Sequence, residues 1–397
     1  MESLTGVVKH YDWGSTDAIP KLLREKPDGR PWAEYWLGVH PAGTAVVDDS
    51  QTGLDAWLSD HPTALSRREQ DAFGSQLPYL LKALAADQPL SLQAHPSRQQ
   101  AEAGYAAEQA RALPLDDPTR NFKDPWPKPE MIVALSEFEV LSGFRDPAAT
   151  LALFEALGVD DDIMRPTFGP LRFREGAAAV AEVFLDCLTL DDTRRAILNE
   201  VLAAAVRHTD DAGEVGRFAR LAIMLDEQYP GDPSLLAALL LNQVRLEPGQ
   251  GLHNAAGVLH SYLRGSGIEI MASSDNVLRA GLTAKHVDHA ALASVIVFDP
   301  GPPDVVVPVA DGPVAWRYPT DDPEFQLWRL TPTDRVDPVP VPGDGLARVV
   351  FVVEGHLELA VPGAASELVQ GQAAFVGADE RPFVSGDGVA FMAAPHL

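Results

Sequence analysis

The sequence predicts a mainly β protein that is interrupted by an α-helical insertion. Short apolar runs separated by glycine and proline, such as Gly6–Val8 and Thr44–Val47, are typical of short strands near the N-terminus. From about residue 147 to 229 the chain becomes rich in alanine and leucine, and its apolar positions recur every three or four residues, as in amphipathic helices. After Leu239 the pattern of strands and turns returns.

Composition excludes several classes of protein. The chain has 397 residues, 46% of them hydrophobic and 22% charged, which is ordinary for a folded protein of two or three domains. Its one cysteine, Cys187, excludes an internal disulfide and a zinc site built from several thiolates. We expect no membrane span and no export signal, and therefore a cytoplasmic protein, because the N-terminus lacks a basic region followed by an apolar run. The net charge of −26 argues against nucleic-acid binding.

The elements follow in order along the chain. A short strand is expected from Gln88 to Pro96, and a helix from Ser97 to about Leu113, because Ser97 and Gln100 have the spacing of a capping box. We expect this helix to support the pocket behind the strand. The insertion is expected to contain four helices: 148–157, 176–188, 191–207 and 212–228.

Strands are predicted again in the last part of the chain. Alternating patterns cover Leu241–Leu246 and Gly267–Ala272. A proline-rich stretch after Asp288 resembles a linker, and it leads to strands at 348–353, 356–361 and 373–376. His356 stands there without a second ligand residue nearby, so this last part is expected to lack a metal site.

Candidate metal ligands lie on the strand that ends near Pro96. Side chains alternate along a strand, so Gln93 and His95 project from the same face, about 6–7 Å apart. An amide and an imidazole cannot hold a divalent ion alone, so this interpretation requires a carboxylate and a second histidine. Glu130 and His260, each next to an apolar run, are the candidates.

Five blocks of sequence resemble the type I phosphomannose isomerase family. They occur in the order in which that family has them, and they span residues 1 to about 290: Tyr11–Ser15, Ala33–Pro41, Leu77–Pro96, Asn121–Met131 and Met271–Thr283. The resemblance implies cupin-type jelly-roll barrels with a helical insertion. It divides the chain into residues 1–146 and 233–295 for the catalytic barrel, 147–232 for the insertion and 296–397 for a C-terminal β domain.

The resemblance also implies an activity, the interconversion of mannose 6-phosphate and fructose 6-phosphate through an enediol. One zinc ion per chain is implied, held by Gln93, His95, Glu130 and His260, although such ligands also accept Mn²⁺ or Co²⁺. Arg279 is implied as a catalytic residue that stabilises negative charge or binds phosphate. Its alternative role is a structural ion pair with Asp275.

Further residues are candidates for proton transfer and substrate binding. Lys128 and Asp275 are candidates for proton transfer, and which group acts as the base stays open. Ser91 and Lys82 are candidates for the phosphate. The substrate is an anion and the chain is acidic, so Lys82, Lys128, Arg279 and Lys285 are expected to reverse the field locally.

Two departures from the family pattern keep alternatives open. Pro127 stands where the family commonly has histidine, and residues 254–257 read Asn-Ala-Ala-Gly where it often has Leu-Pro-Ala-Gly. The protein could therefore isomerise another sugar or sugar phosphate, or be a non-catalytic sugar-binding cupin. We expect a monomer, with a dimer as the alternative.

Overall fold

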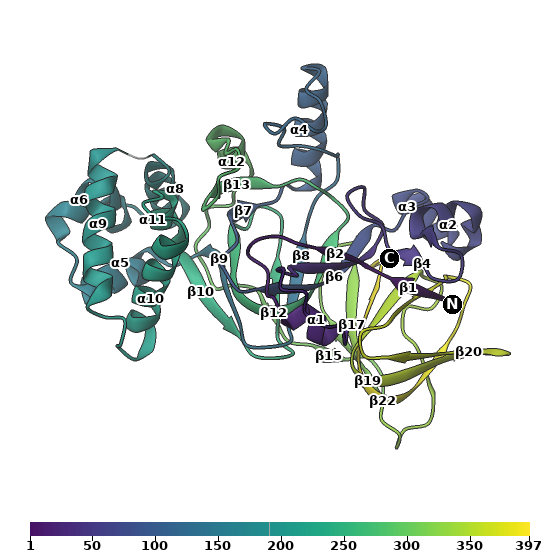
Figure 1. Ribbon diagram of the computed structural model, residues 1–397. Coiled ribbons are helices and arrows are strands. Elements are labelled where there is room, and N and C mark those ends of the chain that lie inside the picture. The colour runs from purple at the N-terminus through teal and green to yellow at the C-terminus, as the bar shows by residue number, and fades with distance from the viewer. Residues whose placement is uncertain (190) are drawn as a thin grey trace.

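The computed structural model describes residues 1–189 and 191–397. A bundle of helices lies on one side, a β structure occupies the centre, and a second β structure that includes most of the C-terminal residues lies on the other side (Figure 1). Among the described helices, none is long and apolar enough to cross a membrane. The boundaries that we predict between domains stay predictions.

The central β structure is organised around one long strand, β12 (His260–Ala272). Its second half pairs with β6 (Tyr79–Ala86) and β8 (Glu130–Ala134), and its first half pairs with β7 (Leu92–Ala94) and β9 (Phe138–Phe144). All these pairings are antiparallel. The other strands of this part are β2 (Val7–Lys9), β3 (Glu34–Gly38), β10 (Leu241–Leu246), β11 (Gly251–Asn254), β13 (Leu278–Gly281) and β14 (Val305–Val306). Because β12 joins both sets of strands, side chains from distant segments converge on one interior.

The predicted strand Gly267–Ala272 is therefore only the second half of β12. Gly265 has a φ of 130° within the strand, and the register with β9 shifts between Tyr262 and Arg264. A glycine and a bulge let a strand turn from one sheet into another without ending. Sequence periodicity breaks at such a point although the strand continues.

The insertion lies between β9 and β10, and its described residues form helices joined by loops and turns, with no strand. Its elements are α5 (Pro147–Leu157), α6 (Asp161–Phe168), α7 (Pro170–Phe173), α8 (Gly176–Cys187), α9 (Asp192–Val206), α10 (Gly213–Gln228) and α11 (Ser234–Ala238). The four predicted helices are confirmed as α5, α8, α9 and α10, with ends that differ by one residue. The short helices α6, α7 and α11 were not predicted, because they present too few turns for a periodic pattern.

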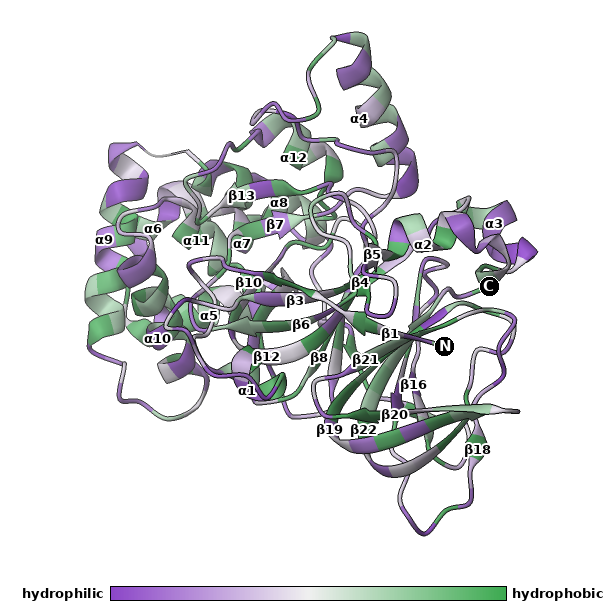
Figure 2. Ribbon diagram, turned by 45° about the vertical axis from the view of Figure 1, so that its right-hand side comes forward, coloured by the Kyte–Doolittle hydropathy of each residue, from purple (hydrophilic) through white to green (hydrophobic). Residues whose placement is uncertain are grey.

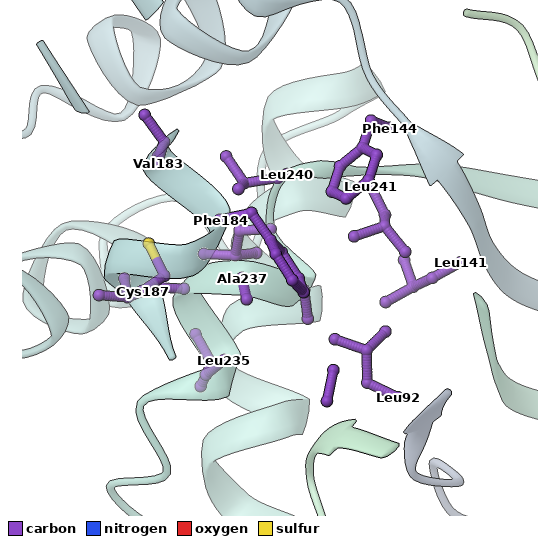
Figure 3. Close-up of a cluster of buried hydrophobic side chains, with 14 of the residues drawn as sticks. Leu92, Leu141, Phe144, Val183, Phe184, Cys187, Leu235, Ala237, Leu240 and Leu241 are labelled. Carbon is purple, nitrogen blue, oxygen red and sulfur yellow. The ribbon is translucent and has the colours of Figure 1, made fainter. Parts of the chain in front are cut away.

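A shared hydrophobic core joins the insertion to the central β structure. Phe184 of α8 lies in one cluster with Leu235 of α11 and with Leu141 and Phe144 of β9, as Figure 3 shows. Leu92 of β7, three residues before His95, belongs to the same cluster and is fully buried. The strand that carries the predicted metal ligands is therefore held from behind by the helices.

The second β structure combines both ends of the chain. Its sheet contains β15 (Val309–Ala310), β16 (Ala315–Tyr318), β17 (Gln326–Leu330), β18 (Val339–Pro340), β19 (Arg348–Val361), β20 (Ala364–Val369), β21 (Ala373–Val376) and β22 (Phe383–Ala394). The N-terminal strands β1 (Glu2–Thr5), β4 (Val46–Val47) and β5 (Thr52–Gly53) extend it beyond β21. Green hydrophobic segments line much of these strands in Figure 2.

One prediction for this part is wrong. The strands expected at 348–353 and 356–361 form a single strand, β19. Gly355 was interpreted as a turn, but it pairs in register with Gly388 of β22, has a φ of 70°, and follows a bulge at Val353, where the register shifts between Val352 and Glu354. The predicted strand at 373–376 is confirmed as β21.

Six further helical elements lie outside the insertion: α1 (Ala18–Leu22), α2 (Leu54–Asp60), the 3₁₀ helix η1 (Pro62–Ala64), α3 (Arg67–Phe73), α4 (Arg98–Ala110) and α12 (His289–Val295), all within the described residues. The capping box of α4 is confirmed, since the side chains of Ser97 and Gln100 each accept from the other's backbone N–H. Helix α4 projects from the top of the molecule (Figure 1) and contributes no residue to the cavity described below. Glu108 of α4 accepts hydrogen bonds from the N–H groups of Asn121 and Phe122. That α4 supports the pocket stays a prediction.

Candidate active site

Three buried side chains converge at the centre of the molecule. Nε2 of His95 and Nε2 of His260 each lie 3.3 Å from the same oxygen, Oε2 of Glu130. One potential ligand atom from each residue lies within 4.8 Å of the other two. Each of the three residues is at most 2% exposed.

Strand register explains this convergence. His260 begins β12, and its Cα partner on β7 is Gln93, two residues before His95. Glu130 begins β8, and its Cα partner near the other end of β12 is Met271. The four residues predicted as ligands thus come from β7, β8, β12 and the residue after β7, and the bent β12 brings these segments together.

The tautomer of each histidine follows from the hydrogen-bond partner of its Nδ1 atom. Nδ1 of His95 lies 2.8 Å from the carbonyl oxygen of Asn276, and Nδ1 of His260 lies 3.0 Å from that of Val258. A carbonyl can only accept, so each Nδ1 carries the proton and each Nε2 presents a lone pair. Burial lowers the pKa of His95 to about 4, although Glu130 opposes the shift, so this imidazole stays neutral at physiological pH.

These lone pairs fit a metal ion. Neither Nε2 atom, nor Oε2 of Glu130, has a hydrogen-bond partner in the described structure, and all three atoms are buried. Burial alone would raise the pKa of Glu130, but the charge of Lys128, whose Nζ contacts Oε1, opposes this, and that pKa lies well below its usual range. An ionised oxygen facing two lone pairs repels them unless a cation lies between, and imidazole and carboxylate are ligands that divalent metals accept.

Gln93 lies beside this cluster. Its side chain lines the same cavity as Glu130, and it makes no side-chain hydrogen bond within residues 1–189 and 191–397. Its amide oxygen is therefore available as a fourth ligand, as we predict.

The cluster opens into a cavity of about 270 Å³. The other residues predicted for the site, Arg279, Lys128, Asp275, Ser91 and Lys82, all line this cavity, as does Lys285. Within the described residues, neither Pro127 nor residues 254–257 line it, so the two departures from the family pattern lie outside its wall.

The charged residues of the wall differ in their partners. Nζ of Lys128 lies 2.6 Å from Oε1 of Glu130, the oxygen that faces away from the histidines. Oδ1 of Asp275 lies 3.3 Å from Nε2 of His40, and hydrogen bonding and charge from His40 lower the pKa of Asp275 although burial opposes this. Arg279 has no carboxylate within 4.0 Å among the described residues, so the alternative ion pair with Asp275 is not formed.

A buried ionic cluster in this wall was not predicted. Nζ of Lys82 lies 2.9 Å from Oε2 of Glu269 and 3.5 Å from Oε1 of Glu34. Burial alone would lower the pKa of Lys82, but the two carboxylates outweigh it and raise that pKa. The sequence signal for this cluster was a charged residue between apolar neighbours in a strand, as in Ile268-Glu269-Ile270. Side chains alternate along a strand, so such a charge lies on the face opposite to that of its two apolar neighbours.

Aromatic residues complete the wall. Tyr11, Trp13, Trp36 and Tyr262 line the cavity, and Trp36 donates from Nε1 to Oε2 of Glu34 over 2.7 Å. Tyr229, just after α10, contributes the insertion's side of the wall. The cavity is therefore polar at its base and aromatic along its sides.

Known proteins resemble this chain over its whole length. A family model described as phosphomannose isomerase type I, catalytic domain, matches residues 1–147. Mannose-6-phosphate isomerase of Escherichia coli (strain K12) is 34% identical over 390 residues, which cover 96% of each chain. The Rattus norvegicus protein of the same name is 29% identical over 404 residues, covering 95% of this chain and 93% of its own.

Solved structures agree with these relatives. A crystal structure of mannose 6-phosphate isomerase bound with zinc and yttrium has a TM-score of 0.90 and 30% identity, and covers 100% of both chains. A zinc-bound holo form has a TM-score of 0.89 at 30% identity, covering 100% of this chain and 99% of that one. The predicted fold class, cupin-type barrels with a helical insertion, is thereby confirmed. This chain belongs to the type I phosphomannose isomerase family.

Proposed function

We propose that the protein is a zinc-dependent mannose-6-phosphate isomerase that interconverts mannose 6-phosphate and fructose 6-phosphate. The observation that carries this function is the convergence of three buried lone pairs, from His95, Glu130 and His260, at the base of a cavity lined by cationic side chains. His95, Glu130, His260 and Gln93 would hold the ion. When bound, zinc would stabilise the negative charge that develops on the two oxygens of the enediol.

The reaction moves a proton between C2 and C1, and the chain offers two groups for this step. Asp275 has a lowered pKa, so it is a carboxylate at neutral pH and can accept a proton. Lys128 is held at the base of the cavity by Glu130, where it can donate to a substrate oxygen. We assign proton transfer to these two groups and leave open which of them takes the proton from carbon.

Substrate binding is proposed for Arg279, Ser91 and Lys82. Arg279 is half-buried, it lines the cavity, and its Cα partner across β13 and β7 is the predicted ligand Gln93. Because no carboxylate lies within 4.0 Å of Arg279 in the described part of the chain, its planar donors are available for a phosphate or an enediolate oxygen. Lys82 has three donors and two carboxylate partners, so one donor remains for a substrate oxygen.

The function is tested with purified protein and mannose 6-phosphate, by coupling the appearance of fructose 6-phosphate to a second enzyme. We expect turnover that a chelator abolishes and added zinc restores, with one zinc per chain by elemental analysis. Turnover that survives complete removal of metal would contradict the proposed role of zinc. A zinc-loaded protein that leaves mannose 6-phosphate unchanged would contradict the proposed substrate.

We also propose that the protein acts in the cytoplasm as a monomer and binds no nucleic acid. The net charge of −26 supports the absence of nucleic-acid binding, and the single, buried Cys187 supports a reducing compartment. Light scattering coupled to size-exclusion chromatography tests the monomer, since a dimer would double the measured mass.

A further inference from the structure

A second cavity, of about 680 Å³, lies between the helical insertion and the central β structure. Its wall comes from the starts of α5 and α10, from β10, and from the loop at residues 300–303. It shares no lining residue with the candidate active site. The isomerase chemistry therefore makes no use of it.

The charge of Arg145, which lines this cavity, is unpaired. The residue is 7% exposed, and its Nη1 donates to the carbonyl oxygen of Leu239 over 3.1 Å. Within residues 1–189 and 191–397 no carboxylate oxygen lies within 4.0 Å of its guanidinium, which instead lies 5.3 Å from the ring centre of Phe218. Burial lowers the pKa of Arg145 to about 10, although the charge of Glu214 opposes the shift, and the group still carries its charge at neutral pH. A buried charge without a partner is unfavourable, and an anion in the cavity would supply the partner.

Other features of the wall also favour an anion. Arg217 is exposed in the first turns of α10, and no carboxylate lies within 4.0 Å of it in the part of the chain that is described. Helix α10 has 16 residues and starts without a side-chain cap, so its first N–H groups keep their partial positive charge. The third arginine of the wall, Arg245, already pairs with Glu137.

The remaining wall residues indicate which kind of anion fits this cavity. Asp146 caps α5 by accepting from the N–H of Ala149, and Glu214 is exposed, so two carboxylates limit the positive charge of the site. They disfavour a highly charged polyphosphate, but their oxygens, with the amide of Gln243, can bind hydroxyl groups. Phe218 and the prolines at 300, 302 and 303 offer an apolar surface to a carbon skeleton.

We propose that this cavity binds a small hydroxylated organic anion with a single phosphate or carboxylate group, which pairs with Arg145. Arg217 contributes a second, more exposed cation, and the hydroxyl groups of the ligand face Asp146, Glu214 and Gln243. The site is separate from the substrate cavity, so the two can be filled independently.

Hydrogen exchange measured by mass spectrometry on the zinc-loaded protein tests this site, because it locates binding along the chain. The probes are glucose 6-phosphate for the phosphate class, gluconate for the carboxylate class, and neutral sorbitol as the control. We expect at least one of the two anions to slow exchange in peptides that cover residues 213–218 and 242–246, and sorbitol to leave them unchanged. Slowing confined to the peptides of the active site, or equal slowing by sorbitol, would overturn the proposal.

Variants assign the effect to the cavity. Arg145→Gln should weaken binding of the anion at least about tenfold. The measure is the anion concentration at which exchange in residues 213–218 is slowed halfway. Because Arg145 is buried, its replacement could disturb folding, so Arg217→Ala provides a second test at an exposed position. This variant should also weaken binding of the anion severalfold. Arg195→Gln, an exposed arginine of α9 that does not line the cavity, is the matched control and should bind as the unmodified protein does. An unchanged midpoint in Arg217→Ala and in folded Arg145→Gln would refute the site.

Discussion

The carbonyl oxygen of Asn276 lies 2.8 Å from Nδ1 of His95. The side chain of the same asparagine is fully buried, and it binds the loop at residues 123–126 through both its oxygen and its nitrogen. Asn276 therefore connects this loop to the predicted metal ligand His95, and its carbonyl determines which ring nitrogen of His95 faces Glu130. A partner of this kind sets the orientation and basicity of a ligand without touching the metal.

Replacing this asparagine should weaken metal binding. In Asn276→Ala the loop loses its anchors and His95 gains freedom to rotate, so we expect zinc affinity to fall about 10–100-fold. Competition with a fluorescent chelator measures this affinity. Asn121→Ala, which removes a hydrogen bond to Asp288 at the protein's periphery, is the control and should keep the original affinity. Equal affinities in the two variants would show that Asn276 does not position His95.

Replacing a metal ligand and replacing a substrate-binding residue should have different effects on zinc content and turnover. His260→Ala is expected to lose both metal and activity, because it removes one of three converging lone pairs. Arg279→Ala should keep one zinc per chain and lose turnover. Elemental analysis and the coupled assay on the same samples distinguish the two. A His260→Ala protein with one bound ion and full activity would show that the cage is incorrectly assigned.

The ionic cluster of Lys82 should matter for stability as well as for activity. Lys82→Met leaves Glu269 and Glu34 buried without their cation, and breaking a buried pair in this way typically costs about 3–5 kcal/mol. Urea denaturation measures the change. Adding Glu269→Gln to Lys82→Met should recover part of the loss, since one unpaired charge is removed. No recovery in the double variant would show that the charges of this cluster do not determine its stability.

A histidine between the two β structures should make stability depend on pH. Nδ1 of His253 lies 3.0 Å from Asp304, and Nε2 lies 2.6 Å from Asp322. Burial alone would lower the pKa of His253, but the two carboxylates outweigh it and raise that pKa. Because the folded pKa exceeds the unfolded value of about 6.5, the stabilisation is complete below that value and is lost as pH rises through the folded pKa.

We therefore expect His253→Gln to be less stable than the unmodified protein at acidic pH, and the difference to shrink as the pH rises. Urea denaturation at a series of pH values measures it. His356→Gln, at an exposed position in β19, is the control and should show no such trend. A difference that grows with pH would mean that His253 is bound in its neutral form.

The sequence alone predicted those helices and strands whose pattern lies within a single continuous segment. The four long helices of the insertion have repeating apolar positions, and α4 has its capping box, so each could be predicted from its own residues. Gln93 and His95 could be paired because they alternate on one strand, and the family resemblance supplied Glu130 and His260. The short helices and the bulge between Val352 and Glu354 carried no signal of that kind.

The tertiary structure decided what depends on strands that are distant in sequence. The bend of β12 brings His260 to Glu130, and its register places Glu269 opposite Lys82, although the two are 187 residues apart in the chain. The tertiary structure also placed β1, β4 and β5 in the sheet of the C-terminal strands. It left Arg145 with no carboxylate within 4.0 Å among the described residues. The sequence specifies which face of a strand a side chain occupies, because that follows from local alternation. Which strands become neighbours depends on the packing of the whole chain, and so does the set of charges that each face meets.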